Sequence, residues 1–171
     1  MSTGQILRTA AEWTATGPDS STDEDAKKHI LQIAAEASWT VGEMQLLPTW
    51  IDRLPKGNES GFNTGIAQVL VSLQQGDLPC AFSLISSLRS NTARSLTSAT
   101  AASLYSCHDS LLRLHVLHEV EHFAKLGRLQ PEDFAPPSFL RSMDQRLAVL
   151  GSYMRDKQFL LGVRRAILTT L

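Results

Sequence analysis

Apolar residues recur at intervals of three and four positions along most of this chain, which is the spacing that gathers them on one face of a helix. The segment 62–73 follows this period closely. Its Val-Leu-Val run at 69–71 could form a strand by itself, but the flanking residues keep the helical spacing. Similar stripes predict roughly eight helices, over Ile6–Trp13, Ile30–Val41, Met44–Ile51, Phe62–Leu73, Leu78–Leu88, about 95–126, Leu140–Leu150 and Phe159–Ile167.

Glycine and proline are concentrated in four breaks between these stripes, at 17–25, 55–61, 76–77 and 127–137. Pro48 and Pro79 fall near the start of a predicted helix, where a missing N–H costs little. Helices joined by such breaks predict antiparallel hairpins, and hairpins stacked side by side form a solenoid. We therefore expect an all-α fold, a tetratricopeptide-like or HEAT-like helical-hairpin solenoid. Its repeats would be degenerate, because the sequence has no strict period.

The amino-acid composition argues against several classes of protein. The 171 residues are 43% apolar, enough for a buried core, and only 19% are charged, which fits a piece that packs against neighbouring chain. The net charge of −1 gives no basic field that would favour nucleic acid or an acidic membrane. The N-terminal residues 1–13 have no long apolar run, so we do not expect them to be a signal peptide. No stretch approaches the roughly 20 apolar residues of a membrane span. Cys80 and Cys107 show neither metal spacing nor a disulfide framework, which predicts reduced thiols in the cytosol or nucleus.

An enzyme-like motif lies in the predicted long helix. The segment HEVEH at 118–122 fits H-E-x-x-H, in which two histidines one helical turn apart bind zinc and the glutamate acts as general base on a zinc-bound water. It also fits the inverted form H-x-x-E-H. The candidate residues are His118, Glu119 and His122. At the helical angle per residue, His108 and His115 fall with these two histidines within an arc of roughly 80°.

We nevertheless predict no metal site and no cofactor. A catalytic zinc needs a third protein ligand, but the extended motif would place a glycine and a histidine at Lys125 and Arg128. Glu132 is too close in sequence for the usual second helix, and Leu104 and Leu111 interrupt the histidine arc. Phosphate-binding, nucleophile-elbow and kinase motifs are also absent, and DFA at 133–135 differs from D-F-G at its third position. The chain is therefore predicted to have no catalytic residue.

The same long helix carries a second pattern. The sequence SLY at 103–105, followed by LLRLHVLHEVEH at 111–122, resembles the run S-Y … Y-x-x-[IL]-V-[RK]-L-H-x-L-x-E-L-E-H of FAT domains. These domains precede the catalytic domain in phosphoinositide-kinase-related protein kinases, and the combination of R-L-H-x-L with E-x-E-H is most similar to ATR. AEASW at 35–39 with Val41-Gly42, the segment 62–77 and LLGVRRAILTTL at 160–171 resemble further family motifs in the same order. The motif residues are Glu36, Trp39, Gly42, Tyr105, Arg113, Leu114, His115, Leu117, Glu119, Glu121, Arg164 and Arg165.

The resemblance spans about 34–171 and suggests two parts of the chain. Residues 1–25, a helix and an acidic loop, match nothing in the family and stay unassigned, whereas 26–171 form a partial FAT helical-repeat region. The sequence departs from the family pattern at Cys107, His108 and Asp109, and no tryptophan follows Gly42. These departures leave the exact parent kinase open.

The resemblance implies a role as well as a fold. FAT domains are solenoids that curl around the kinase domain, support it and carry regulatory contacts. The implied partners are the kinase domain of the parent chain, a partner of the ATR-interacting-protein type and a second copy in a homodimer, with no direct nucleic-acid or membrane binding. The parent would be a nuclear checkpoint kinase that phosphorylates serine or threonine before glutamine during replication stress and DNA damage. We expect Arg113, Arg164 and Arg165 to be solvated or ion-paired on packed helices.

Two alternatives to a non-catalytic scaffold stay open. An independent helical-repeat module would bind a peptide or partner protein in its groove, and a zinc hydrolase would use the HEVEH motif. On the scaffold hypothesis, the chain stops within the helical pattern of 160–171, and a solenoid cut there would expose apolar surface. We therefore expect low solubility and a low unfolding temperature for the isolated chain.

Overall fold

A computed structural model of the chain describes residues 3–15, 23–55, 61–99, 104–126 and 137–170. Within these ranges it contains eight helices and no strand, which confirms the all-α prediction. The acidic loop expected at 17–25 lies mostly outside the described residues, but its last three residues are helical, because α2 begins at Asp23. The helices are α1 (Thr3–Ala15), α2 (Asp23–Val41), α3 (Leu47–Arg53), α4 (Phe62–Gln74), α5 (Leu78–Ala99), α6 (Leu104–Leu126), α7 (Pro137–Val149) and α8 (Met154–Thr170).

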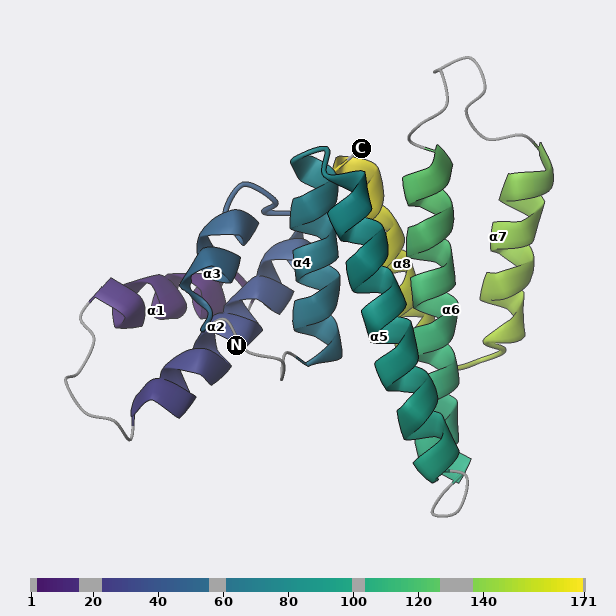
Figure 1. Cartoon of the computed structure of the whole chain (residues 1–171), viewed down its shortest axis with the longest axis horizontal. Coiled ribbons are helices and arrows are strands. Elements are labelled where there is room, and N and C mark those ends of the chain that lie inside the picture. Colours follow the sequence, from purple (N-terminus) through teal and green to yellow (C-terminus); the bar gives the residue numbers. More distant parts are fainter. Residues whose placement is uncertain (1–2, 16–22, 56–60, 100–103, 127–136, 171) are drawn as a thin grey trace.

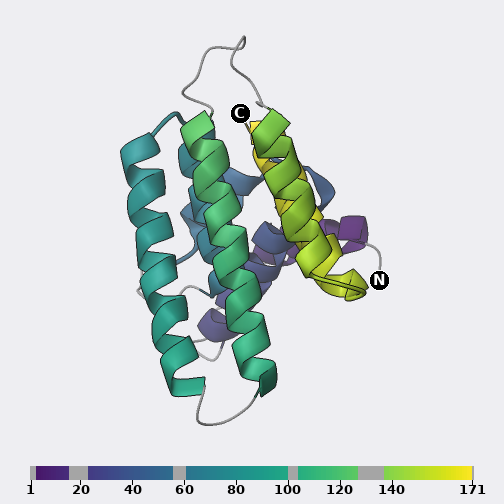
Figure 2. The ribbon, with the colours of Figure 1, turned by 90° about the vertical axis from the view of Figure 1, so that its right-hand side faces the viewer.

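Successive helices pack as neighbours, as expected for a solenoid-like stack of hairpins. α1 packs on α2, α2 on α3, α3 on α4, α4 on α5 and α5 on α6. The last helix then returns across the stack, and α8 packs against α2, α4 and α6 together (Figure 1). α7 lies at the outer side of α6, away from the N-terminal helices (Figure 2). The returning α8 therefore joins the two halves of the chain.

The hydrophobic core follows the faces that these helices turn toward one another. α2 contacts four other helices, so its buried surface is wide and includes the fully enclosed Trp39. A fully buried apolar side chain of this kind stabilises the fold by about 1.5–3 kcal/mol relative to an exposed one. The largest fully buried side chains are Trp39, Leu31, Leu47, Ile66, Leu70, Ile85, Leu117, Leu160, Ile167, Val69, Val116 and Val120.

The helix ends follow the glycine and proline signals of the sequence. Gly42 ends α2 with a φ of 97°, and its N–H and that of Glu43 both donate to the Ser38 carbonyl at 2.9 Å. A non-glycine residue is strained in this left-handed conformation. The Asp77 carboxylate accepts a hydrogen bond from the Cys80 N–H at 3.0 Å and so caps the start of α5. Pro48 stands in the first turn of α3, as predicted.

The structure corrects one predicted helix boundary. The sequence pattern predicted one long helix from about 95 to 126, but α5 continues to Ala99 and α6 begins at Leu104. The sequence between the two helices, at 100–103, lies outside the described residues and contains only alanine, serine and threonine, with neither glycine nor proline to mark a boundary. None of the helices in the described ranges combines the length and apolar character needed to cross a membrane.

The three-and-four spacing places Ile30, Ile33, Ala34, Ala37 and Val41 on one apolar stripe of α2, and this stripe is only partly buried. Ala34 and Ala37 face the core, but the Ile33 and Val41 side chains are exposed. The buried face also takes in Ala35 and Ser38, whose hydroxyl donates to the Ala34 carbonyl at 2.9 Å. A helix with four neighbours buries more than one stripe, so the positions chosen by a simple three-and-four spacing do not define its core.

Gly65 of α4 packs directly against Leu88 of α5, and this contact gives a stability prediction. A Cβ atom at this position would lie 2.4 Å from Leu88 Cδ2 and 3.1 Å from Leu88 Cγ. Because Leu88 is itself buried, Gly65→Ala is expected to lower the free energy of unfolding by about 1–3 kcal/mol. The control is Gly4→Ala in α1, where a Cβ meets nothing within 4 Å. Urea unfolding that ranks the two variants equally would contradict this packing.

Candidate functional site

The helix α6 carries both the HEVEH motif and the family pattern. One face of it is buried among α5 and α8, with Val116, Leu117 and Val120 fully enclosed. Successive residues of an α-helix are rotated by about 100° about the helix axis. His118 and Glu119 therefore point to different surroundings. Glu119 is 3% exposed, whereas His118 and His122 are exposed.

The Glu119 carboxylate forms a buried ion pair with Arg164 of α8. Arg164 Nε donates to one carboxylate oxygen and an Arg164 terminal nitrogen donates to the other, both at 2.7 Å. The same guanidinium also donates to the Met143 carbonyl of α7 at 2.9 Å. The Arg164 side chain is only 11% exposed. Such two-point pairing is the strongest and most directional form of an arginine–carboxylate contact, and here it connects three helices.

This pairing decides what Glu119 can do chemically. A general base must reach the water that it deprotonates, but both oxygens of Glu119 are already bound to a guanidinium within the protein interior. Removing a single partner of a buried ion pair leaves an uncompensated charge. Glu119 is therefore held as a structural anchor between α6 and α8.

The two motif histidines lie on the outer side of α6. Their rings stack on each other with centroids 6.1 Å apart, and the His122 ring stacks on Phe139 of α7 at 5.0 Å. Burial lowers the pKa of His118, and the neighbouring Arg146 and His122 lower it further. No group of three or more histidine, cysteine or carboxylate side chains in the described part of the chain is placed to hold a metal ion.

The second arginine of the pair contacts the end of α2. The Arg165 guanidinium donates to the Thr40 carbonyl, one of the last carbonyls of α2, which have no partner within that helix. Close by, the Trp39 ring packs edge-on against Phe159 of α8 with centroids 6.0 Å apart. Trp39, Gly42 and Arg165 thus come together where α2 ends against α8, although they are far apart in the sequence.

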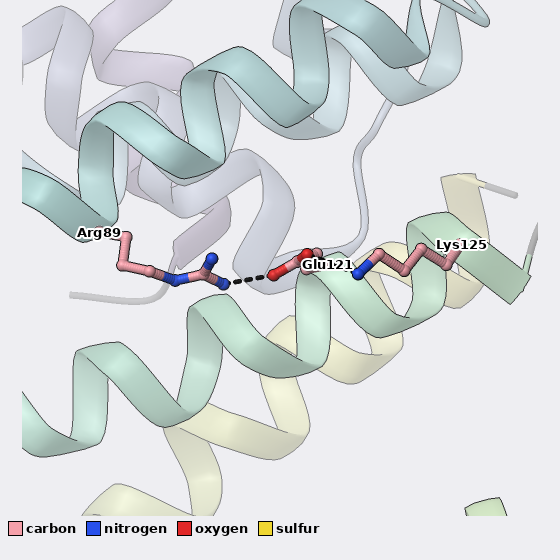
Figure 3. Close-up of polar contacts among 3 residues, drawn as sticks. All are labelled: Arg89, Glu121 and Lys125. Carbon is pink, nitrogen blue, oxygen red and sulfur yellow. Dashed lines mark hydrogen bonds and ion pairs between the residues drawn. The ribbon is translucent and has the colours of Figure 1, made fainter.

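Glu121 forms a separate ion-pair cluster on the α5 side of α6. Arg89 of α5 and Lys125 of α6 both donate to its carboxylate, with Lys125 Nζ at 2.6 Å (Figure 3). These hydrogen bonds, from Lys125 first and then Arg89, lower the pKa of Glu121 to about 2. The two glutamates of the E-x-E-H sequence therefore bind different helices: Glu119 binds Arg164 of α8, and Glu121 binds Arg89 of α5.

The remaining predicted residues lie at the opposite half of α6 and on α2. Arg113 is paired with Asp109 at 2.7 Å and lies over the Phe62 ring at 5.2 Å. Glu36 of α2 is half-buried, and together with Phe62, Asp109 and Arg113 it lines a groove between the helices. Leu117 is in the core, while Leu114 and His115 are half-buried. Tyr105 belongs to the first turn of α6, and its side chain lies outside the described residues.

Comparison with known protein families agrees with this arrangement of motifs. The FAT domain model matches residues 31–171, which include the second half of α2 and all of α3 to α8. The chain belongs to the FAT domain family. FAT domains are helical, non-catalytic scaffolds of phosphoinositide-kinase-related proteins. The ion pairs and core contacts of this FAT domain are the features that hold such a scaffold in shape.

Several partners in this FAT domain had no signal in the sequence. Arg89 binds Glu121, Asp156 binds His108 at 2.7 Å, and the Met143 carbonyl binds Arg164. Each partner is between 21 and 48 residues from the group that it binds. Charged residues on helix surfaces are common, and only the packing of the FAT domain shows which of them meet.

Zinc content tests the structural role of the HEVEH segment. We expect the FAT domain, purified without a histidine tag and dialysed against metal-free buffer, to retain far less than one zinc per chain. Glu119 is bound to Arg164, and a tight site needs a third protein ligand. Elemental analysis gives the result. One equivalent of zinc that resists dialysis and is lost in His118→Ala would contradict it.

The low pKa of Glu121 predicts a pH-dependent contribution to stability. A carboxyl with a lower pKa in the folded state stabilises the fold above its unfolded value, near 4.5, and loses that contribution as the pH falls to about 2. Glu121→Gln should therefore cost about 1 kcal/mol at pH 7, because its cationic partners are partly solvated. The cost should vanish toward pH 2. Asp52→Asn on α3 serves as the exposed control, and a cost for Glu121→Gln that is independent of pH would contradict the assignment.

Proposed function

We propose that this FAT domain is the helical scaffold of an ATR-like checkpoint Ser/Thr protein kinase, and that it supports the kinase domain and its protein contacts in the nucleus. The observation that carries the proposal is the dual use of the E-x-E-H sequence on α6. Glu119 binds Arg164 of α8 and Glu121 binds Arg89 of α5, so the two glutamates of the motif connect α6 to both neighbouring helices. The resemblance of this helix to ATR supports the choice of an ATR-like kinase as the parent.

A scaffold acts by keeping distant surfaces at a fixed distance. The Glu119–Arg164 pair joins α6 to α8 and, through the Met143 carbonyl, to α7. Arg165 and Trp39 join α8 to the end of α2. A displacement at one end of α8 would therefore be transmitted to α2 and to α6. This coupling suits a segment that supports a kinase domain and passes on the effect of bound partners.

The proposal is tested by measuring the protein-kinase activity that is recovered together with this protein from cells. The endogenous protein is tagged, recovered from nuclear extract before and after replication arrest, and assayed with peptides containing serine followed by glutamine. We expect phosphorylation that increases after arrest and that is lost when alanine replaces the glutamine. Recovery of a kinase partner of the ATR-interacting-protein type and of a second copy would support the proposed contacts.

Two outcomes of this experiment would reject the proposal. Recovery without any kinase activity on serine–glutamine peptides, from cytosol alone, would favour an independent helical-repeat module that binds a partner protein. Kinase activity without preference for glutamine would assign the scaffold to a different member of the kinase family. The variant Arg164→Ala provides an internal comparison, since loss of the α6–α8 pair should reduce the recovered activity more than Arg165→Ala.

A further inference from the structure

A groove lies where α2, α4, α6 and α8 meet, on the half of α6 away from the HEVEH segment. Its volume is about 920 Å³. This is within the range of about 300–1,000 Å³ of sites that bind small ligands or parts of peptides. The groove is lined by Glu36, Phe62, Asn63, His108, Asp109, Leu112, Arg113, Tyr153, Arg155, Asp156 and Phe159.

Most of the charged groups in the groove already have partners. His108 Nε2 contacts the Asp156 carboxylate at 2.7 Å, and an Arg113 terminal nitrogen contacts the Asp109 carboxylate at 2.7 Å. Glu36 differs from them, because its carboxylate has neither a hydrogen bond nor an ion pair with any described residue. It is half-buried rather than exposed. A partly desolvated carboxylate without a partner gains the most from a cation that enters the groove.

The groove also offers aromatic surfaces to a cation. Phe62 and Phe159 are half-buried in its wall, and Tyr153 stands at its edge with 65% of the residue exposed. Arg113 already lies over the Phe62 ring, 5.2 Å from its centre. This contact shows that one ring of the groove, that of Phe62, already binds a guanidinium within the protein itself. The face of an aromatic ring attracts cations and not anions.

From these features we propose that the groove is a binding site for an arginine or lysine side chain presented by a protein segment, with Glu36 as its ion-pair partner and Tyr153 as a ring contact. An acidic side chain fits less well. The Arg113 charge is neutralised by Asp109, and Arg155 is an exposed lining residue in the first turn of α8, so the surrounding water weakens its attraction for an anion. Three carboxylates and two guanidinium groups line the groove.

A peptide titration tests this proposal without knowledge of the natural partner. The probes are capped glycine pentapeptides with arginine, lysine, leucine or glutamate at the centre, added to the isotope-labelled chain and followed by NMR at low salt. We expect the arginine and lysine peptides to shift signals of groove residues in a saturable and salt-dependent manner. The leucine and glutamate peptides should bind at least tenfold more weakly.

Variants distinguish binding in the groove from nonspecific attraction of a cationic peptide to any surface carboxylate. Glu36→Gln should weaken binding of the arginine peptide about tenfold, the value of one charged contact, while Asp52→Asn on α3 should leave it unchanged. Tyr153→Ala, at an exposed side chain that folding does not require, should weaken it about threefold and serves if Glu36→Gln fails to fold. Equal binding of the arginine and glutamate peptides, or binding that neither groove variant weakens, would overturn the proposal. The proposal does not depend on the identity of the parent kinase.

Discussion

Replacing Arg164 by alanine is expected to lower the free energy of unfolding by about 3–5 kcal/mol, because it leaves the Glu119 carboxylate buried without a counter-charge. The side chain makes three hydrogen bonds, two to Glu119 and one to the Met143 carbonyl, all between 2.7 and 2.9 Å. A protein with a typical stability of about 5–15 kcal/mol would lose much of it. Urea unfolding followed by circular dichroism measures the change.

The neighbouring arginine supplies the matched control. Arg165 has the same side chain on the same helix, but it is exposed and donates to one backbone carbonyl, that of Thr40. Arg165→Ala should cost about 1 kcal/mol or less. Equal losses for the two variants would mean that the Glu119–Arg164 pair does not anchor α8.

Trp39→Ala is expected to lower the free energy of unfolding by about 3–5 kcal/mol, through the cavity left between α2 and α8. Trp39 is 1% exposed, and its ring contacts Phe159 and approaches the Gly162 backbone. Its indole N–H is buried and has no hydrogen-bond partner among the described residues. The contribution of Trp39 is therefore packing, and Trp39→Phe should cost clearly less than Trp39→Ala.

Thermal and urea unfolding of three variants would test this packing role. Tyr153→Ala is the control for aromatic substitution, because that ring is largely exposed, and its cost should stay below about 1 kcal/mol. A Trp39→Phe variant as unstable as Trp39→Ala would contradict the interpretation, since phenylalanine retains most of the apolar volume.

The sequence predicted which segments form helices more accurately than the residues at which those helices begin and end. Spacing of apolar residues located α4 because nine of its residues, Thr64 to Leu73 except Gln68, are buried around a strong stripe. The boundary between α5 and α6 was wrong because the residues there are compatible with a helix and contain no glycine or proline. In α2, Ile33 and Val41 were predicted to be buried, but the contacts of this helix with four neighbours select other positions.

The candidate site was predictable as a set of residues but not as a set of contacts. Glu119 and Arg164 were both identified by the family pattern, and nothing in the local sequence indicates that they meet 45 residues apart. The choice between a zinc base and a structural carboxylate also depended on what surrounds Glu119. Helical geometry places His118 and Glu119 on different sides of α6, and only the position of α8 fills one of those sides with a guanidinium.

The central claim is that Glu119 of the HEVEH segment acts as a structural partner of Arg164 within a non-catalytic scaffold. A double-mutant cycle with Glu119→Gln, Arg164→Met and the combined variant, measured by urea unfolding at pH 7, tests it most directly. We predict a coupling free energy of about 2–3 kcal/mol between the two sites, with the combined variant more stable than either single one. A coupling near zero, with the losses simply adding, would contradict the account.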